Sequence, residues 1–224
     1  STAVKEMSEG ELLQIEKARR LDIEEEVYFE IITKKTASLI AASCAAGAVA
    51  TTKDPKHIEF MRKFGETVGI AFQIKDDLFD YGTSNIGKPT GIDIKEKKMT
   101  LPLIYALNNA TSADKKKYIN LIKKDSENPS VIKDVTTFVE SSGGLEYATK
   151  KMEYYKAKAL QMLDQIPNLE ARQSLDQLVR FVTERKKLLS LSILQSLASI
   201  INIISAYAVS FNNYLYLLLT NMFN

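Results

Sequence analysis

The sequence has few of the residues that form disulfides or structural metal sites in small, loop-rich proteins. Its 224 residues include one Cys, one His and no Trp. A single thiol cannot form an internal disulfide, so we expect a protein of a reducing compartment. The lone Cys and the lone His do not match the spacing of a zinc site. With 9 Gly and 5 Pro, turn residues are scarce as well. Folds with many short strands need such residues often, so the composition favours an all-helical fold.

An excess of charge of one sign is missing too. The chain has 30 Lys and Arg against 28 Asp and Glu, which gives a formal net charge of +2. This balance provides no broad basic surface, and we expect no nucleic-acid partner. At 45% hydrophobic and 26% charged residues, the chain can bury one sizeable core and lacks the composition of a disordered protein.

The charged residues end abruptly before the C-terminus. Residues 188–224 contain no Asp, Glu, Lys or Arg and are mostly apolar. About 20 apolar residues can span a bilayer, so this tail could contact a membrane, but a non-native extension explains it equally well. Arg185 and the two lysines after it would keep the preceding part on the cytoplasmic side of a membrane. We therefore divide the chain into a folded part, residues 1–187, and a hydrophobic tail, residues 188–224.

Capping residues and apolar spacing predict helices throughout the folded part. Ser8 and Glu11 match a capping box at the start of the first helix. Asp54 and Pro55 match the N-cap and first position of a long helix, and Asn128 matches the N-cap of a later one. Small residues in the second helix would let a neighbouring helix approach closely. The predicted helices span residues 8–21, 24–49, 54–81, 101–109, 113–124, 129–141, 145–165 and 169–187.

The end of the third predicted helix carries the clearest chemical signal. Gln73, Asp76, Asp77 and Asp80 stand at relative positions 0, 3, 4 and 7, which share one helix face. We expect the three carboxylates to converge on a hard divalent cation, Mg²⁺, while phosphate oxygens fill its other ligand positions. A solvated acidic face is the alternative, but the negative end of the helix dipole disfavours acids there.

A lysine-rich loop follows this acidic cluster. Residues 87–102 combine flexible glycines with four lysines. If the loop folds back, Lys88 and Lys98 could offer positive charge to a diphosphate held by the metal. A lysine-rich loop alone is more often only soluble surface, and its position beside the carboxylates is what favours binding.

These segments resemble the trans-isoprenyl diphosphate synthases, also called polyprenyl synthetases. Residues 72–80 (FQIKDDLFD) resemble the second aspartate-rich motif of that family, and residues 87–102 resemble its GKxxGxD…KxTLP loop. Residues 10–14 (GELLQ) resemble its GExxQ helix, and residues 28–38, which include Lys35 and Thr36, resemble its YxxIIxxKT helix. The resemblance covers residues 1–187, the C-terminal part of such an enzyme. It implies an all-α, isoprenoid-synthase-type helical bundle that is incomplete at its N-terminus.

The resemblance also implies a reaction and residue roles. Such enzymes condense an allylic diphosphate with isopentenyl diphosphate in the cytoplasm, usually as homodimers, with Mg²⁺ as Lewis acid. Carried over by position, Asp76 would contact Mg²⁺ directly, with Asp77 and Asp80 as further ligands. Lys35 and Lys88 would bind the allylic diphosphate. Thr36 and Gln73 would direct oxygen dipoles at the allylic cation; by themselves, each is more often an ordinary polar helix residue.

The chain also departs from the family pattern. It contains neither the first aspartate-rich motif nor the GGKRxRP-type segment that binds isopentenyl diphosphate, and the acidic run at residues 24–26 is better explained as a solvated surface. We therefore expect the 224-residue chain alone to form no product in millimolar Mg²⁺. Lys97 stands where the family often has Gly, and His57 is predicted to lie on the surface.

Three hypotheses follow from these patterns. The first is a portion of a trans-polyprenyl diphosphate synthase. The second is a non-catalytic subunit that partners a complete synthase chain in a heteromeric enzyme. The third is a helical protein anchored to a membrane by residues 188–224, in which the acidic helix end is incidental.

Overall fold

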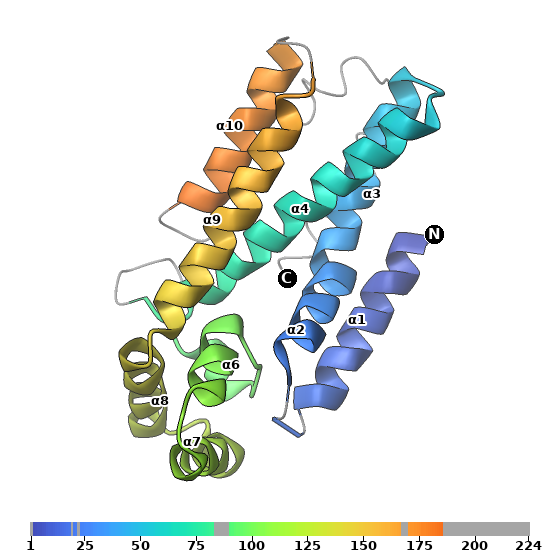
Figure 1. Ribbon diagram of the computed structural model, residues 1–224. Coiled ribbons are helices and arrows are strands. Elements are labelled where there is room, and N and C mark those ends of the chain that lie inside the picture. Colours follow the sequence, from blue (N-terminus) through green and yellow to red (C-terminus); the bar gives the residue numbers. More distant parts are fainter. Residues whose placement is uncertain (1, 19, 22, 83–89, 167–169, 186–224) are drawn as a thin grey trace.

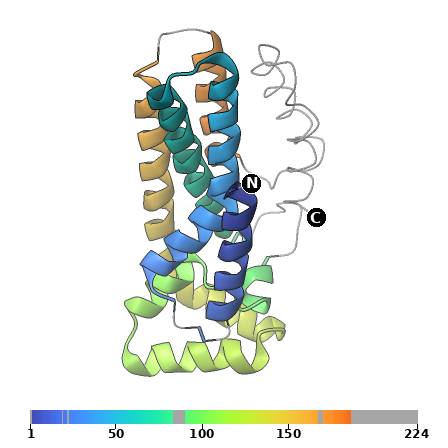
Figure 2. The same cartoon turned by 90° about the vertical axis from the view of Figure 1, so that its right-hand side faces the viewer.

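The computed structural model describes residues 2–18, 20–21, 23–82, 90–166 and 170–185, and within them every regular element is a helix. The long helices stand side by side, while α6, α7 and α8 lie at one end of them (Figures 1 and 2). The predicted all-α bundle is thus confirmed. In chain order the elements are α1 (Thr2–Ala18), α2 (Glu25–Ile32), the π-helix η1 (Thr33–Ala37), α3 (Ser38–Thr51), α4 (Pro55–Phe79), α5 (Ile92–Lys95), α6 (Leu101–Asn108), α7 (Ser112–Asp125), α8 (Pro129–Ser141), α9 (Gly144–Leu163) and α10 (Glu170–Glu184).

Two of the three predicted helix caps are confirmed and one is wrong. The Asp54 carboxylate accepts from the backbone N–H of Lys56, and the Asn128 amide oxygen accepts from that of Ser130, both at 3.0 Å. Ser8 is no N-cap, because α1 already begins at Thr2 and the Ser8 hydroxyl donates to the Val4 carbonyl at 3.0 Å. A capping residue needs unpaired N–H groups ahead of it, and the helical turn before Ser8 removes them.

The predicted helix over residues 24–49 is continuous but not uniform. Between α2 and α3 the chain forms the π-helix η1, in which each backbone hydrogen bond spans five residues instead of the four of an α-helix. Such turns are rare and often occur at functional sites. Here the wider turn contains Lys35 and Thr36, the two residues of this segment for which the sequence predicts chemical roles.

Glycines in α4 let that helix approach its neighbours closely. A Cβ at Gly65 would lie 2.6 Å from the Ile40 carbonyl oxygen, and one at Gly69 would lie 2.6 Å from the Ala37 Cα. Both contacts are shorter than side-chain atoms tolerate, so α4 lies against η1 and α3 almost backbone to backbone. The predicted close approach at the small residues is thus confirmed.

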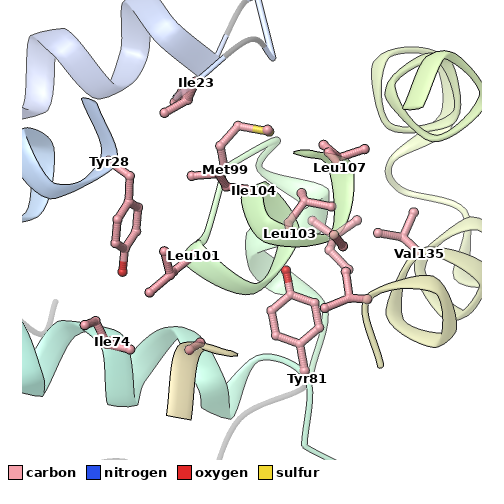
Figure 3. Packing of buried hydrophobic residues seen from close by; sticks show 14 of the residues in the cluster. Ile23, Tyr28, Ile74, Tyr81, Met99, Leu101, Leu103, Ile104, Leu107 and Val135 are labelled. Carbon is pink, nitrogen blue, oxygen red and sulfur yellow. The ribbon is translucent and has the colours of Figure 1, made fainter. Parts of the chain in front are cut away.

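Buried side chains form two hydrophobic clusters. The larger joins α2, α4, α6, α8 and α9, and Figure 3 shows Tyr28, Ile74 and Leu101 facing one another within it. The smaller lies between α4, α9 and α10 and includes Phe72 and Val179. The end of α4 therefore packs on both clusters, which fixes the position of its acidic residues.

The acidic run at residues 24–26 is not only a solvated surface. The Glu25 carboxylate accepts from the Tyr147 hydroxyl at 2.6 Å and from the Lys151 ammonium at 2.8 Å. These bonds tie α2 to α9 across more than a hundred residues of sequence, which is why the local pattern could not indicate them. His57 is exposed, as predicted.

No helix in the described part of the chain has both the length and the apolarity needed to cross a bilayer. The predictions for residues 188–224 lie outside that part.

Candidate functional site

Three segments that carry the sequence motifs meet at η1. The Lys35 ammonium lies 2.6 Å from the Glu11 carboxylate and 3.3 Å from the Gln14 amide oxygen, both of α1. Gly10 permits this contact, because a Cβ there would lie 2.6 Å from the Lys35 backbone nitrogen. The predicted diphosphate-binding Lys35 is therefore positioned by an ion pair and a hydrogen bond to the GELLQ segment.

On its other side η1 contacts α4 through a chain of polar side chains. The Thr36 hydroxyl donates to the Gln73 amide oxygen at 2.9 Å, and the Gln73 amide nitrogen donates to the Asp77 carboxylate at 3.0 Å. The second carboxylate oxygen of Asp77 accepts from the Tyr28 hydroxyl at 2.7 Å. The sequence predicted the importance of Thr36, Gln73 and Asp77, and the structure brings them together.

Tyr28 is a site residue for which the sequence predicted no role. Its ring is buried, and its hydroxyl points toward α4 (Figure 3). Burial, followed by the nearby Asp77 charge, raises the pKa of Tyr28 well above its ordinary value, so the hydroxyl is a neutral donor at physiological pH. Burial first, and the charge of Asp93 second, raise the pKa of Asp77 to about 7. The signal for Tyr28 in the sequence was its place at the start of the segment that resembles the YxxIIxxKT helix.

Asp76 faces a different partner. Its carboxylate accepts from the Arg185 guanidinium at 2.5 Å, just after α10. The guanidinium also lies over the rings of Phe72 and Phe79, with centroid distances of 4.6 and 5.2 Å. The Arg185 side chain is 3% exposed, and its Nη1 atom is buried with no hydrogen-bond partner among the described residues. The sequence pattern indicated Arg185 only as a flank of the hydrophobic tail, so this contact was missed.

Asp80 organises the backbone that follows α4. Its side chain is fully buried and accepts from the backbone N–H groups of Ile92 and Asp93 at 2.9 and 3.1 Å. The carboxylate thereby caps the first turn of α5, and the Asp80 carbonyl accepts from the N–H of Gly91 at 2.9 Å. Asp80 thus links the C-terminal end of α4 to the first turn of α5.

The three carboxylates predicted to converge have separate partners. Asp76 contacts Arg185, just after α10, while Asp77 contacts α2 and Asp80 contacts α5. Among the residues described, no group of three His, Cys, Asp or Glu side chains lies close enough to hold a metal ion. The joint Mg²⁺ site stays a prediction. One carboxylate still fits the cation, because Mg²⁺ is often bound through one or two carboxylates together with substrate phosphates.

The basic loop is described from residue 90 onward. Lys88 lies outside the described residues. The Lys98 ammonium lies 2.5 Å from Glu96 and 3.3 Å from Asp93, so it too is paired with carboxylates. Lys97 has a φ of 56°, in the left-handed region that favours glycine.

These contacts place several polar groups on and around α4. They include hard oxygen donors at Asp76 and ammonium groups at Lys35 and Lys98. They also include an ordered hydroxyl and amide at Thr36 and Gln73. This set of groups suits a metal-bound, highly charged anion such as a diphosphate.

Comparisons with known proteins agree with this chemistry. The family model for polyprenyl synthetase matches residues 1–139. The chain is 36% identical over 180 residues to the short chain isoprenyl diphosphate synthase of Methanothermobacter thermautotrophicus, covering 80% of this chain and 55% of that protein. It is 32% identical over 188 residues to the heptaprenyl diphosphate synthase component 2 of Bacillus subtilis, covering 83% of this chain and 53% of that protein.

A solved structure extends the likeness to the fold. The crystal structure of the geranylgeranyl pyrophosphate synthase of Bacteroides thetaiotaomicron matches with a TM-score of 0.76 and 40% sequence identity, over 83% of this chain and 62% of that one. The chain therefore spans only about half of the length of the curated relatives it matches.

Proposed function

Because this chain belongs to the polyprenyl synthetase family, we propose that it is part of a prenyltransferase that joins isopentenyl diphosphate to an allylic diphosphate, making a trans-polyprenyl diphosphate. The relatives it matches carry names of prenyl diphosphate synthases. The proposal concerns the activity of an enzyme of which this chain matches about half.

One observation supports the proposal above the others. The three motif segments, residues 10–14, 28–38 and 72–80, lie far apart in sequence but contact one another through Lys35 and Thr36. Nothing in helix packing alone requires polar side chains to meet there, since buried polar groups cost free energy unless they are paired. A binding site for a charged substrate accounts for their meeting.

Asp76 is the residue we propose as the direct Mg²⁺ ligand. Its carboxylate already accepts from a cation, the Arg185 guanidinium, so its surroundings suit positive charge. Both oxygens of Asp77 and both of Asp80 accept hydrogen bonds from neighbouring donors. Bound Mg²⁺ would supply Lewis-acid stabilisation of the diphosphate leaving group.

We propose that three lysines bind the substrate diphosphate and that the Thr36–Gln73 pair stabilises the allylic cation. Lys35, Lys88 and Lys98 are proposed to bind diphosphate oxygens. Lys35 and Lys98 are ion-paired with carboxylates here, so a diphosphate would take the place of those partners. The oxygen dipoles of Thr36 and Gln73 are proposed to face the allylic cation, where a preorganised dipole stabilises developing charge.

Mg²⁺-dependent binding of inorganic pyrophosphate tests the proposal. We expect calorimetry on the full chain to detect binding in millimolar Mg²⁺ and none with EDTA. Asp76→Asn should lower the affinity by about tenfold or more, which corresponds to about 1.4 kcal/mol. Asp134→Asn, which changes an exposed carboxylate of α8, is the matched control and should bind as the wild type does. Absence of binding by the wild type would refute the proposed function.

The assembly is part of the same proposal. We propose a cytoplasmic homodimer, supported by the exposed apolar side chains of Val4, Leu12 and Ile15, which share one face of α1. Sedimentation velocity should give twice the mass of the chain, and a monomer that does not change with concentration would contradict the dimer.

A non-catalytic subunit of a heteromeric synthase is the second candidate. The name of the Bacillus subtilis relative, a synthase component 2, favours it. Binding of pyrophosphate without product formation by the chain alone, with product restored by a co-expressed second chain, would support this candidate over the homodimer.

A further inference from the structure

The second acidic residue of the α4 motif sits in a hydrogen-bond chain whose direction is fixed. Gln73 donates its amide N–H to Asp77, so its amide oxygen must face Thr36. An oxygen can only accept, and the Thr36 hydroxyl therefore has to donate to it. Because the Thr36 hydroxyl proton is donated to Gln73, both lone pairs of the Thr36 oxygen stay available to a group on its other side. Asp77 thus determines which end of the Thr36 dipole is available.

A hydrogen-bond acceptor is required at the end of this chain. If residue 77 offered no acceptor, the Gln73 amide could turn by 180° and present its N–H groups to Thr36. The Thr36 oxygen would then accept from Gln73 with one of its lone pairs. That lone pair could no longer face the group on the side of Thr36 away from Gln73. The negative end of this dipole is the end that can stabilise a cation.

Tyr28 anchors the other oxygen of Asp77. Its hydroxyl donates at 2.7 Å from a ring that is only 3% exposed within the larger hydrophobic cluster. The side chain of Asp77 is itself buried and is held from two sides, by Tyr28 and Gln73. Consecutive residues lie about 100° apart around a helix, which explains why Asp76 turns to α10 while Asp77 turns to α2.

We propose that Asp77 is a positioning residue rather than a metal ligand: anchored by Tyr28, it fixes the orientation of the Gln73 amide and, through it, the polarity of the Thr36 hydroxyl. This inference rests on the proposed function for the role of the Thr36 dipole. The two neighbouring acids of the motif then have different roles. Asp76 contacts the metal, whereas Asp77 orients Gln73 and Thr36, which face the allylic part of the substrate.

The orientation of Gln73 has a direct spectroscopic readout. In a ¹⁵N-labelled full chain, the side-chain amide signals of Gln73 are assigned by their loss in Gln73→Met. Asp77→Leu removes the acceptor and should shift these signals. Asp77→Asn should restore them toward the wild-type positions, because the asparagine oxygen can accept from Gln73 while its amide nitrogen donates to the Tyr28 hydroxyl. Unchanged signals in Asp77→Leu, or no rescue by Asp77→Asn, would overturn the inference.

Calorimetry with Mg²⁺ and inorganic pyrophosphate tests the other half. Asp76→Asn should lose about tenfold more affinity than Asp77→Asn, a difference of about 1.4 kcal/mol. Equal losses in the two variants would identify Asp77 as a metal ligand and refute the proposal. This comparison needs only the two asparagine variants, so it decides the question even if Asp77→Leu does not fold. Failure of the wild type to bind pyrophosphate refutes the proposed function instead, and the Gln73 signals still report on the hydrogen-bond chain.

Discussion

A single methyl group added at Gly69 should disrupt the contact between α4 and η1. Its Cβ would lie 2.6 Å from the Ala37 Cα and 2.8 Å from the Ala37 Cβ, and the backbone there cannot turn aside as a flexible side chain would. Such overpacking costs about 1–3 kcal/mol. Separation of the two helices should also weaken the Thr36–Gln73 hydrogen bond, worth about 1 kcal/mol. The higher helix propensity of alanine offsets about 1 kcal/mol. We expect Gly69→Ala to lower the free energy of unfolding by about 2 kcal/mol.

Gly47→Ala is the matched control for this change. Gly47 lies inside α3, and a Cβ there would meet no atom of the described residues within 4 Å, so only the helix propensity should change. Urea unfolding followed by circular dichroism should show Gly47→Ala more stable than the wild type by about 0.5–1 kcal/mol. The melting temperature of Gly69→Ala should fall by about 4–8 °C. If Gly69→Ala unfolded within about 0.5 kcal/mol of the wild type, the close approach of α4 and η1 would be refuted.

Three further predictions concern the polar groups around α4. Because Lys97 has a positive φ, Lys97→Gly should be more stable in urea than Lys97→Ala by about 1 kcal/mol, and equal stability would exclude strain there. Asp76→Asn and Arg185→Met should each cost about 3 kcal/mol, since either breaks the ion pair between the buried guanidinium and the largely buried carboxylate. A double-mutant cycle should find the double variant less destabilised than the sum, and additivity would contradict the pair. Asp80→Asn should cost about 1–3 kcal/mol without any pyrophosphate present, because an amide NH₂, which cannot accept, would replace one of the two oxygens that bond the backbone N–H groups of α5. Unchanged melting would show that Asp80 does not cap this turn.

The sequence predicted best those features that depend on a few neighbouring residues. The caps at Asp54 and Asn128 were predictable because each side chain bonds a backbone group two residues away. Ser8 shows the limit of the same reasoning. Its pattern was that of a cap, but whether a helix has already begun depends on the preceding turn, where the apolar spacing provided no clear signal.

The candidate site was predictable by residue type but not by contact. Spacing and resemblance singled out Lys35, Thr36 and Gln73, and the structure joins two of them directly. The partners Tyr28 and Arg185 were missed, because they contact the acidic residues across 49 and 109 positions of sequence. Contacts of that range depend on how whole helices pack, and a helical period within one segment contains no information about them.

The geometry of α4 explains why the three acids contact different partners in the structure. Asp76 and Asp77 are neighbours, so their side chains leave the helix about 100° apart, and each meets a different packed helix. Asp80 lies one turn beyond Asp76, but α4 ends at Phe79, and the Asp80 carboxylate there meets the unpaired N–H groups of α5. Helix ends leave such donors unsatisfied, and a buried carboxylate satisfies two of them at once. A run of acidic residues along one helix can therefore serve three different partners, and the partner of each acid, not its spacing, determines what it can bind.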